Sequence, residues 1–260
     1  MADTILRSCL TAFARGLVIA SLAAAGAGAA ELKVISAGAV RGVLKGMIDD
    51  YARLSGHTFN FTIGSTGQLR EVIASGQPAD LLIAASAVMD ELEKTGGMIA
   101  GSRVDLGAIG VGVVLREGVT KADITTPEGF RQALIDAKTI AYTDPKLGGA
   151  TYTHLIKLAE GFGIAEMVKA KGVHATGGDD AAGKVMRGEA DIATVFTSEV
   201  QAAGAKLAAP LPESLQMWAV YSAGIPGSSR EPAHAREFVS ALVGPALRER
   251  WIAAGWRVGK

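Results

Sequence analysis

Residues 64–84 have the sequence GSTGQLREVIASGQPADLLIA. This order predicts a polar glycine loop, a helix that starts near Gln68, a turn and a buried strand. Residues 59–63 alternate apolar and polar, so a strand leads into the loop. Ser65 or Thr66 can cap the helix, and the free N–H groups of its first turn favour an anion. The stretch is therefore a candidate ligand site, with a plain capped helix as the alternative.

The first thirty residues have the order of a cleaved secretory signal. Arg7 and Arg15 precede an apolar run at 17–25, and small residues follow through Ala30. An uncleaved anchor is the alternative, although the run is short for a membrane span. The signal predicts a periplasmic protein. The only cysteine, Cys9, lies in this segment, so the mature chain should have neither a disulfide nor thiol chemistry.

Composition excludes some classes of partner. The chain has 26 Lys and Arg against 26 Asp and Glu, and only 5% of its residues are aromatic. It therefore lacks the basic face that nucleic-acid binding requires, and we expect no nucleic-acid partner. About 230 residues remain after the signal, enough for one or two hydrophobic cores.

A pattern of glycine, Ala-Asp and buried strand occurs twice. Residues 76–83 read GQPADLLI and residues 188–195 read GEADIATV, which places Asp80 and Asp191 at matching turns. We expect a structural role for both carboxylates. The repeat predicts two lobes of similar build, each with a parallel sheet flanked by helices. Helical spacing predicts helices over 43–54, 152–160 and 181–187, each after a glycine loop. Ligands of such sheets bind at the carboxyl ends of the strands.

Other motifs argue against common catalytic sites. Residues 178–185, GDDAAGKV, have phosphate-loop spacing but lack the Ser or Thr that follows the lysine, so Asp179 or Asp180 is expected to cap a helix instead. The four histidines are scattered, and no pair has metal-ligand spacing. No Gly-x-Ser-x-Gly elbow is present. We therefore expect neither a metal nor a cofactor.

Two arginines lie near glycine loops. Arg41 follows the first loop, and Arg70 lies in the first turn of the helix after residue 67. A cation at a helix start is electrostatically unfavourable, so both positions suggest an anionic ligand, since arginine binds carboxylates at two points. Solvated surface arginines are the alternative.

These segments together resemble the periplasmic molybdate-binding proteins and their relatives among type 2 periplasmic binding proteins. The resemblance runs from about Leu32 to Val258 and rests on the following segments: VISAGA at 34–39, STG at 65–67, GQPAD at 76–80, Asp144-Pro145, GEAD at 188–191 and Gly244-Pro245. It implies an α/β fold of two lobes, 31–107 plus 215–260 and 108–214. It also implies a two-strand hinge at about 106–114 and 217–222, and a monomer that serves a membrane permease and its ATPase.

The resemblance also carries over the family's ligand positions. It implies a ligand set of Ala39, Ser65, Thr66, Ala150, Thr151, Asp180 and Phe196, to which Arg41 and Arg70 are added from the charge argument. Ala39 stands where the family has a serine, and Phe196 where it has a tyrosine. Two donors of a molybdate site are then missing, although Ser65 or Thr66 keeps the hydroxyl of the second loop, and buried acceptors left unpaired are costly.

The sequence therefore predicts a periplasmic receptor that is not an enzyme and that closes its lobes on a small organic anion. A di- or tricarboxylate held by Arg41 is favoured over molybdate or tungstate. An exported enzyme on the same scaffold, such as a lyase or transferase, is the alternative of a different class, and a signalling or adhesion module is a third.

Overall fold

A computed structural model describes residues 28–259 of the chain. Most of the predicted signal, with Cys9, lies outside the described residues. Within them, no helix has the length and apolar character that a membrane span requires.

The described strands form one nine-stranded sheet with the order β2-β1-β3-β9-β4-β7-β5-β6, and β8 pairs with β4. The strands are β1 (Glu31–Ala37), β2 (Thr58–Gly64), β3 (Leu81–Ala85), β4 (Val104–Leu115), β5 (Ile140–Thr143), β6 (Gly172–Ala175), β7 (Ile192–Phe196), β8 (Ala209–Pro210) and β9 (Trp218–Gly224).

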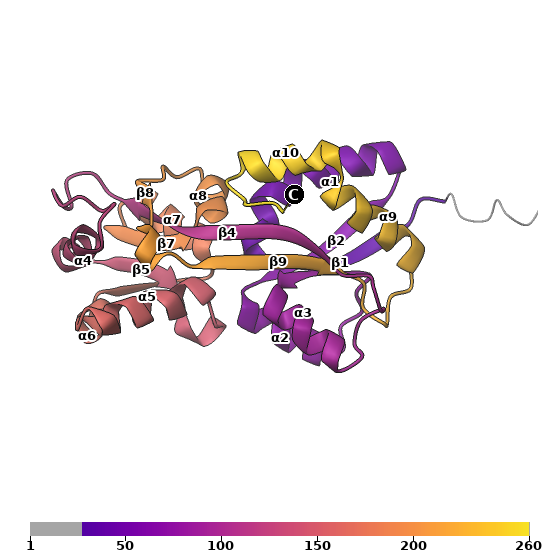
Figure 1. Ribbon diagram of the computed structural model, residues 1–260, viewed down its shortest axis with the longest axis horizontal. Helices are drawn as coiled ribbons and strands as arrows, with labels where there is room; N and C mark the ends of the chain where they lie inside the picture. Colours follow the sequence, from indigo (N-terminus) through magenta and orange to yellow (C-terminus); the bar gives the residue numbers. More distant parts are fainter. Residues whose placement is uncertain (1–27, 260) are drawn as a thin grey trace, which may run out of the picture.

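Two parallel groups of strands lie at the ends of this sheet. β1 pairs in parallel with both β2 and β3, and β5 pairs in parallel with both β6 and β7. The antiparallel strands β4 and β9 run side by side from one group to the other and join two α/β lobes (Figure 1). The chain therefore crosses between its lobes along two long strands.

Helices flank each lobe (Figure 1). They are α1 (Arg41–Ser55), α2 (Thr66–Ala74), α3 (Ser86–Lys94), α4 (Pro127–Asp136), α5 (Ala150–Gly161), α6 (Ala165–Ala170), α7 (Gly178–Met186), α8 (Thr197–Ala202), α9 (Pro232–Val243) and α10 (Pro245–Ala253). Short 3-10 turns occur at Gly38–Val40, Pro145–Leu147 and Glu213–Leu215.

The capping of α2 illustrates how local sequence sets these boundaries. The Ser65 side chain accepts a hydrogen bond from the backbone N–H of Gln68, and the Gln68 side chain accepts one from the backbone N–H of Ser65. This reciprocal capping box satisfies donors that a helix start otherwise leaves unpaired. It fixes the angle at which α2 leaves β2.

The apolar core runs through both lobes. One large cluster extends from Leu32 on β1 to Leu155 on α5 and includes the middle of β4. A smaller cluster lies under α7, where Ala181 and Ala182 pack with Ala193 of β7. Alanines at this contact let α7 lie close to the sheet, which brings its first turn to the strand ends.

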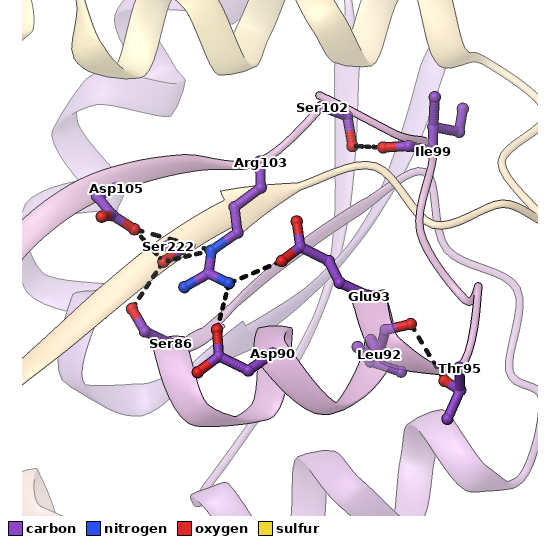
Figure 2. A network of polar contacts seen from close by, with 10 residues as sticks. All are labelled: Ser86, Asp90, Leu92, Glu93, Thr95, Ile99, Ser102, Arg103, Asp105 and Ser222. Atoms are coloured by element: carbon purple, nitrogen blue, oxygen red, sulfur yellow. Dashed lines mark hydrogen bonds and ion pairs between the residues drawn. The ribbon is translucent and has the colours of Figure 1, made fainter.

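A polar network fixes the lobe 1 end of the two crossing strands (Figure 2). Ser222 of β9 is fully buried; its hydroxyl donates to Asp105 of β4 at 2.6 Å and lies 2.8 Å from the Ser86 hydroxyl at the start of α3. Arg103 donates to the Ser222 hydroxyl and pairs with Asp90 at 2.5 Å, and it also pairs with Glu93 of α3. The strands are thus tied to a helix of lobe 1.

The C-terminal segment ties itself to the same strands. Ala108 and Arg257 exchange two backbone hydrogen bonds of 2.8 Å each. The guanidinium of Arg257 lies 3.4 Å above the ring of Trp218 on β9, at a distance typical of a cation–π contact.

Candidate functional site: a cleft between the two lobes

A cavity of about 290 Å³ lies where strands of both lobes end. Its walls include the last residues of β1, β2, β5 and β7, which are Ala37, Gly64, Thr143 and Phe196, and Thr176 directly after β6. The carboxyl ends of parallel strands from the two lobes therefore face one space, the usual position of a ligand in open α/β sheets.

Helices α2, α5 and α7 begin at this cavity. The starts of α2, α5 and α7 all contribute wall residues, among them Thr66, Ala150 and Gly178. First-turn N–H groups have no partner inside their own helix, and each helix start carries partial positive charge. Three such starts around one cavity make a site for negatively charged groups.

The lobes contact one another across the cleft. The Ser65 hydroxyl of lobe 1 donates to the carbonyl of Leu147, and the Ser198 hydroxyl of lobe 2 donates to the carbonyl of Ala39 at 2.6 Å. Arg41 Nη1 lies 3.2 Å from Asp179 Oδ2. The structure is therefore a closed arrangement of the lobes.

The structure brings most of the predicted ligand residues to this cavity. Its lining includes Ala39, Arg41, Ser65, Thr66, Ala150, Thr151 and Phe196. Arg41 is not an isolated cation there, because Asp179 pairs with it. The Ser65 hydroxyl is also engaged, since it caps α2 and donates to Leu147.

Two predicted residues lie away from the lining. The guanidinium of Arg70 makes two hydrogen bonds to Glu91 on α3, at 2.7 and 3.2 Å. Asp180 accepts from the backbone N–H of Thr176 at 3.0 Å and pairs with Arg187. Its neighbour Asp179 lines the cavity instead.

The two matching aspartates hold turns together. Asp80 accepts backbone N–H bonds from Lys33, Arg230 and Glu231 and a hydroxyl bond from Ser229. Burial by itself would raise the pKa of Asp80, but these donors hold the pKa below its usual value. The carboxylate stays ionised and performs the structural work expected from the sequence.

Glu199 is a wall residue that the sequence reasoning missed. It lies in the first turn of α8 and lines the cavity. Its Oε2 accepts a 2.9 Å hydrogen bond from the backbone N–H of Phe196, and its carboxyl also accepts from the N–H of Gly178. Burial, reinforced by the nearby charge of Asp179, raises the pKa of Glu199 to about 7 against these two donors. The sequence did contain a signal for Glu199, because a glutamate three residues after the strand end at Phe196 is typical of a capped helix start.

Tyr221 of β9 is a second missed residue. Its ring is buried, and the side chain lines the cavity between the rings of Phe196 and Trp256, whose centroids lie 6.0 and 5.7 Å away. Burial, with the nearby Glu199 carboxyl, raises the pKa of Tyr221, so the phenol stays protonated. A tyrosine of β9 thus lines the cleft, whereas Phe196 has no hydroxyl.

Residues 28–259 contain no group of three or more His, Cys, Asp or Glu side chains that could hold a metal ion. The chemistry of the described cleft is that of cations, backbone donors, hydroxyls and carboxyls.

A family model for bacterial extracellular solute-binding proteins matches residues 32–257. The chain belongs to this family. A molybdate-binding protein, ModA, of Azotobacter vinelandii is 30% identical over 185 residues, which is 70% of each chain. The resemblance stated from the sequence is confirmed.

The solved structures agree on the fold. The periplasmic molybdate-binding protein of Azotobacter vinelandii matches with a TM-score of 0.74 at 24% identity, covering 88% of this chain and all of that one. The predicted two-lobed type 2 periplasmic binding fold is confirmed. The chain is thus a bacterial extracellular solute-binding protein.

Another relative corrects one prediction. A Pseudomonas protein named aconitate isomerase is 27% identical over 217 residues, 81% of each chain. The prediction that the chain is not an enzyme is therefore wrong. That prediction rested on the lack of a nucleophile, a metal set and a cofactor loop. An isomerisation by proton transfer requires none of these, only an acid–base group beside the substrate.

Proposed function

We propose that this protein binds a small organic tricarboxylate of the aconitate type in the cleft and isomerises it there. The observation that carries the proposal is the composition of one cavity, where the Arg41 guanidinium and three helix starts meet a carboxyl group, Glu199. The cationic groups suit the carboxylates of the ligand, and Glu199 supplies a group that can exchange a proton.

The cavity suits an organic acid better than molybdate. Its volume of about 290 Å³ is near the lower end for small-molecule pockets, about 300 Å³. Ala39 and Phe196 present carbon to it, so two positions of the wall offer no side-chain donor to a compact oxyanion. A tricarboxylate can spread its charges toward Arg41 and the helix starts, and place its carbon skeleton against the apolar positions.

Family membership supports a role in uptake as well. We propose that the mature protein is a periplasmic monomer of two lobes, 31–107 plus 215–260 and 108–214. Its partners would be a membrane permease and the ATPase of that transporter. Binding and isomerisation are compatible, because both require the lobes to enclose the same ligand.

A thermal-shift screen with matched conversion assays tests the proposal. The purified protein is heated with cis-aconitate, trans-aconitate, citrate, molybdate or tungstate, and each aconitate isomer is followed by proton NMR. Ligand stabilises the fold by RT ln(1 + [L]/Kd), so an aconitate isomer should raise the melting temperature and be converted to the other isomer. Arg41→Ala should remove the shift, because loss of a paired arginine contact costs on the order of 2–5 kcal/mol.

Arg53→Ala is the matched control. Arg53 lies on the same helix α1 and pairs with Asp50, outside the cavity lining. The Arg53→Ala variant should show the same increase in melting temperature with an aconitate isomer as the parent protein. A large shift with molybdate and none with any carboxylate would overturn the choice of ligand, whereas binding without conversion would overturn the isomerase assignment alone.

A further inference from the structure

We propose that Glu199 is the group that removes a proton from the bound ligand and returns it at another carbon. The inference rests on the proposed function and deepens it, because it names the residue that performs the chemistry.

The position of the Glu199 carboxyl is fixed by two separate helices. The backbone N–H of Phe196 holds it at the start of α8, and the N–H of Gly178 holds it at the start of α7. A Cβ atom at position 178 would lie 1.9 Å from Oε2. Only glycine at this position leaves room for the carboxyl, and Glu199 is one of the residues that line the cavity.

The surroundings suit a group that exchanges protons at neutral pH. Asp179 of α7 lies near Glu199, Tyr221 of β9 lines the same cavity, and Arg41 from α1 pairs with Asp179. The pKa of Glu199 near 7 means that the ionised and protonated forms coexist at that pH. A general base or acid is most effective when its pKa is near the working pH.

The reaction requires one proton and no electrons from outside. Aconitate carries a CH₂ group beside its double bond. Ionised Glu199 takes a proton from this CH₂, and the electron pair of the broken C–H bond forms a double bond to the central carbon. The electron pair of the original double bond moves to the carbon at its far end. That carbon takes the proton back from Glu199. The original C=C becomes a rotatable single bond, which allows the cis and trans isomers to exchange.

The cavity wall can stabilise the negative charge that forms on the ligand during this proton transfer. Removing the proton spreads negative charge into the carboxylates of the ligand. Arg41 and the starts of α2, α5 and α7 lie around the cavity, and prearranged positive groups stabilise such charge. Glu199 thus moves the proton while the other wall groups hold the anion.

The test separates binding from proton transfer. The protein is incubated with cis-aconitate in D₂O, and NMR follows both deuterium entry at the CH₂ position and formation of the trans isomer. Glu199→Gln keeps the size of the side chain and one acceptor for the backbone donors. It should keep an aconitate melting shift and lose both exchange and conversion by about 10²- to 10⁴-fold, the usual contribution of general acid–base catalysis.

Glu189→Gln is the control, because Glu189 lies beyond the other end of α7 and pairs with Arg187. It should exchange and convert like the parent. In Gly178→Ala the Glu199 carboxyl is still present but is displaced, so exchange should again fall. The parent rate should also rise with pH through about 7, and Glu199→Asp should shift this profile.

Parent-like exchange in Glu199→Gln would overturn the inference and leave the proposed function standing. Absence of any aconitate shift in the parent protein would instead overturn the proposed function. If Glu199→Gln fails to fold, the Gly178→Ala rate and the pH profiles decide, and unchanged values in both would refute a role for Glu199.

Discussion

Asp191 shows how one buried carboxylate holds lobe 2 together. It accepts from the backbone N–H of Lys138 at 2.6 Å and of Thr139 at 3.3 Å, and it pairs with Arg116. Burial by itself would raise the pKa of Asp191, but Arg116 and the backbone donors lower it below its usual value. These bonds connect β7 to the chain before β5 and to the end of β4.

Asp191→Asn should destabilise the protein at pH 7 by about 1–3 kcal/mol, the cost of leaving buried donors poorly satisfied. Because the folded pKa is lowered, this stability is complete above the unfolded pKa of about 3.9 and is lost as the pH falls through the folded pKa. Urea denaturation from pH 3 to 7 measures the effect. Glu166→Gln, at an exposed ion pair with Lys169, serves as the control. A constant difference at all pH values would contradict the ionic explanation.

At the residue scale, the sequence predicted which loops form the cavity better than it predicted where individual side chains point. The glycine loops identified the positions where Ser65, Thr66 and Thr151 line the cavity. Whether Arg70 faced the cleft depended on Glu91, twenty-one residues away, which pairs with it on α3. The Glu199 side chain can be buried because residue 178 is a glycine. No local sequence pattern predicts this contact.

The start of α2 lies close against the backbone of the other lobe. A Cβ atom at Gly67 would lie 2.6 Å from the carbonyl oxygen of Leu147 and 3.2 Å from Cα of Gly148. Gly148 itself has a φ of +67°, a conformation that favours glycine. The two glycines together allow these elements to touch.

Gly67→Ala should therefore hinder closure without weakening lobe 1, because alanine is the better helix former by about 1 kcal/mol. We expect the ligand-free melting temperature to be kept and the affinity for aconitate, measured by calorimetry, to fall at least about tenfold, or about 1.4 kcal/mol. Gly161→Ala is the control, since no atom lies within 4 Å of its Cβ. Parent affinity in Gly67→Ala would show that this approach does not limit binding.

At the element scale, helices with clear apolar spacing were predicted closely. The prediction of 43–54 corresponds to α1 at Arg41–Ser55, and 152–160 to α5 at Ala150–Gly161. Short elements were not predicted, among them α6 at Ala165–Ala170, α8 at Thr197–Ala202 and β8 at Ala209–Pro210. These are formed by tertiary contacts rather than by local periodicity, as when β8 adds to the edge of β4.

For the whole molecule, the cross-lobe contacts combine hydrogen bonds, such as the buried Ser198–Ala39 bond, with one exposed ion pair. The Arg41–Asp179 pair has side-chain exposures of 58% and 36%, and such surface pairs contribute only about 0–1 kcal/mol. This ion pair therefore adds little to the stability of the closed arrangement. A ligand that bridges the two lobes adds contacts that only the closed state can make.

We expect small-angle scattering to show a larger radius of gyration without ligand and a smaller one with saturating aconitate. The movement should be centred on β4 and β9, because they alone cross between the lobes as strands in residues 28–259 (Figure 1). Arg41→Ala with the same ligand should keep the larger value. Identical curves with and without ligand in the parent would contradict closure.

The contact between Gly178 and Glu199 has a consequence for the history of such proteins. A side chain at 178 and a carboxyl from 199 cannot occupy the same space, so the two positions should not change independently. If Glu199 performs the proposed proton transfer, lineages that keep glycine with glutamate would retain this chemistry. Those that gained a larger residue at 178 would have lost the carboxyl from the wall and become carriers alone. On the proposed role of Glu199, this pair of positions would distinguish catalysts from carriers in an alignment, before any assay is performed.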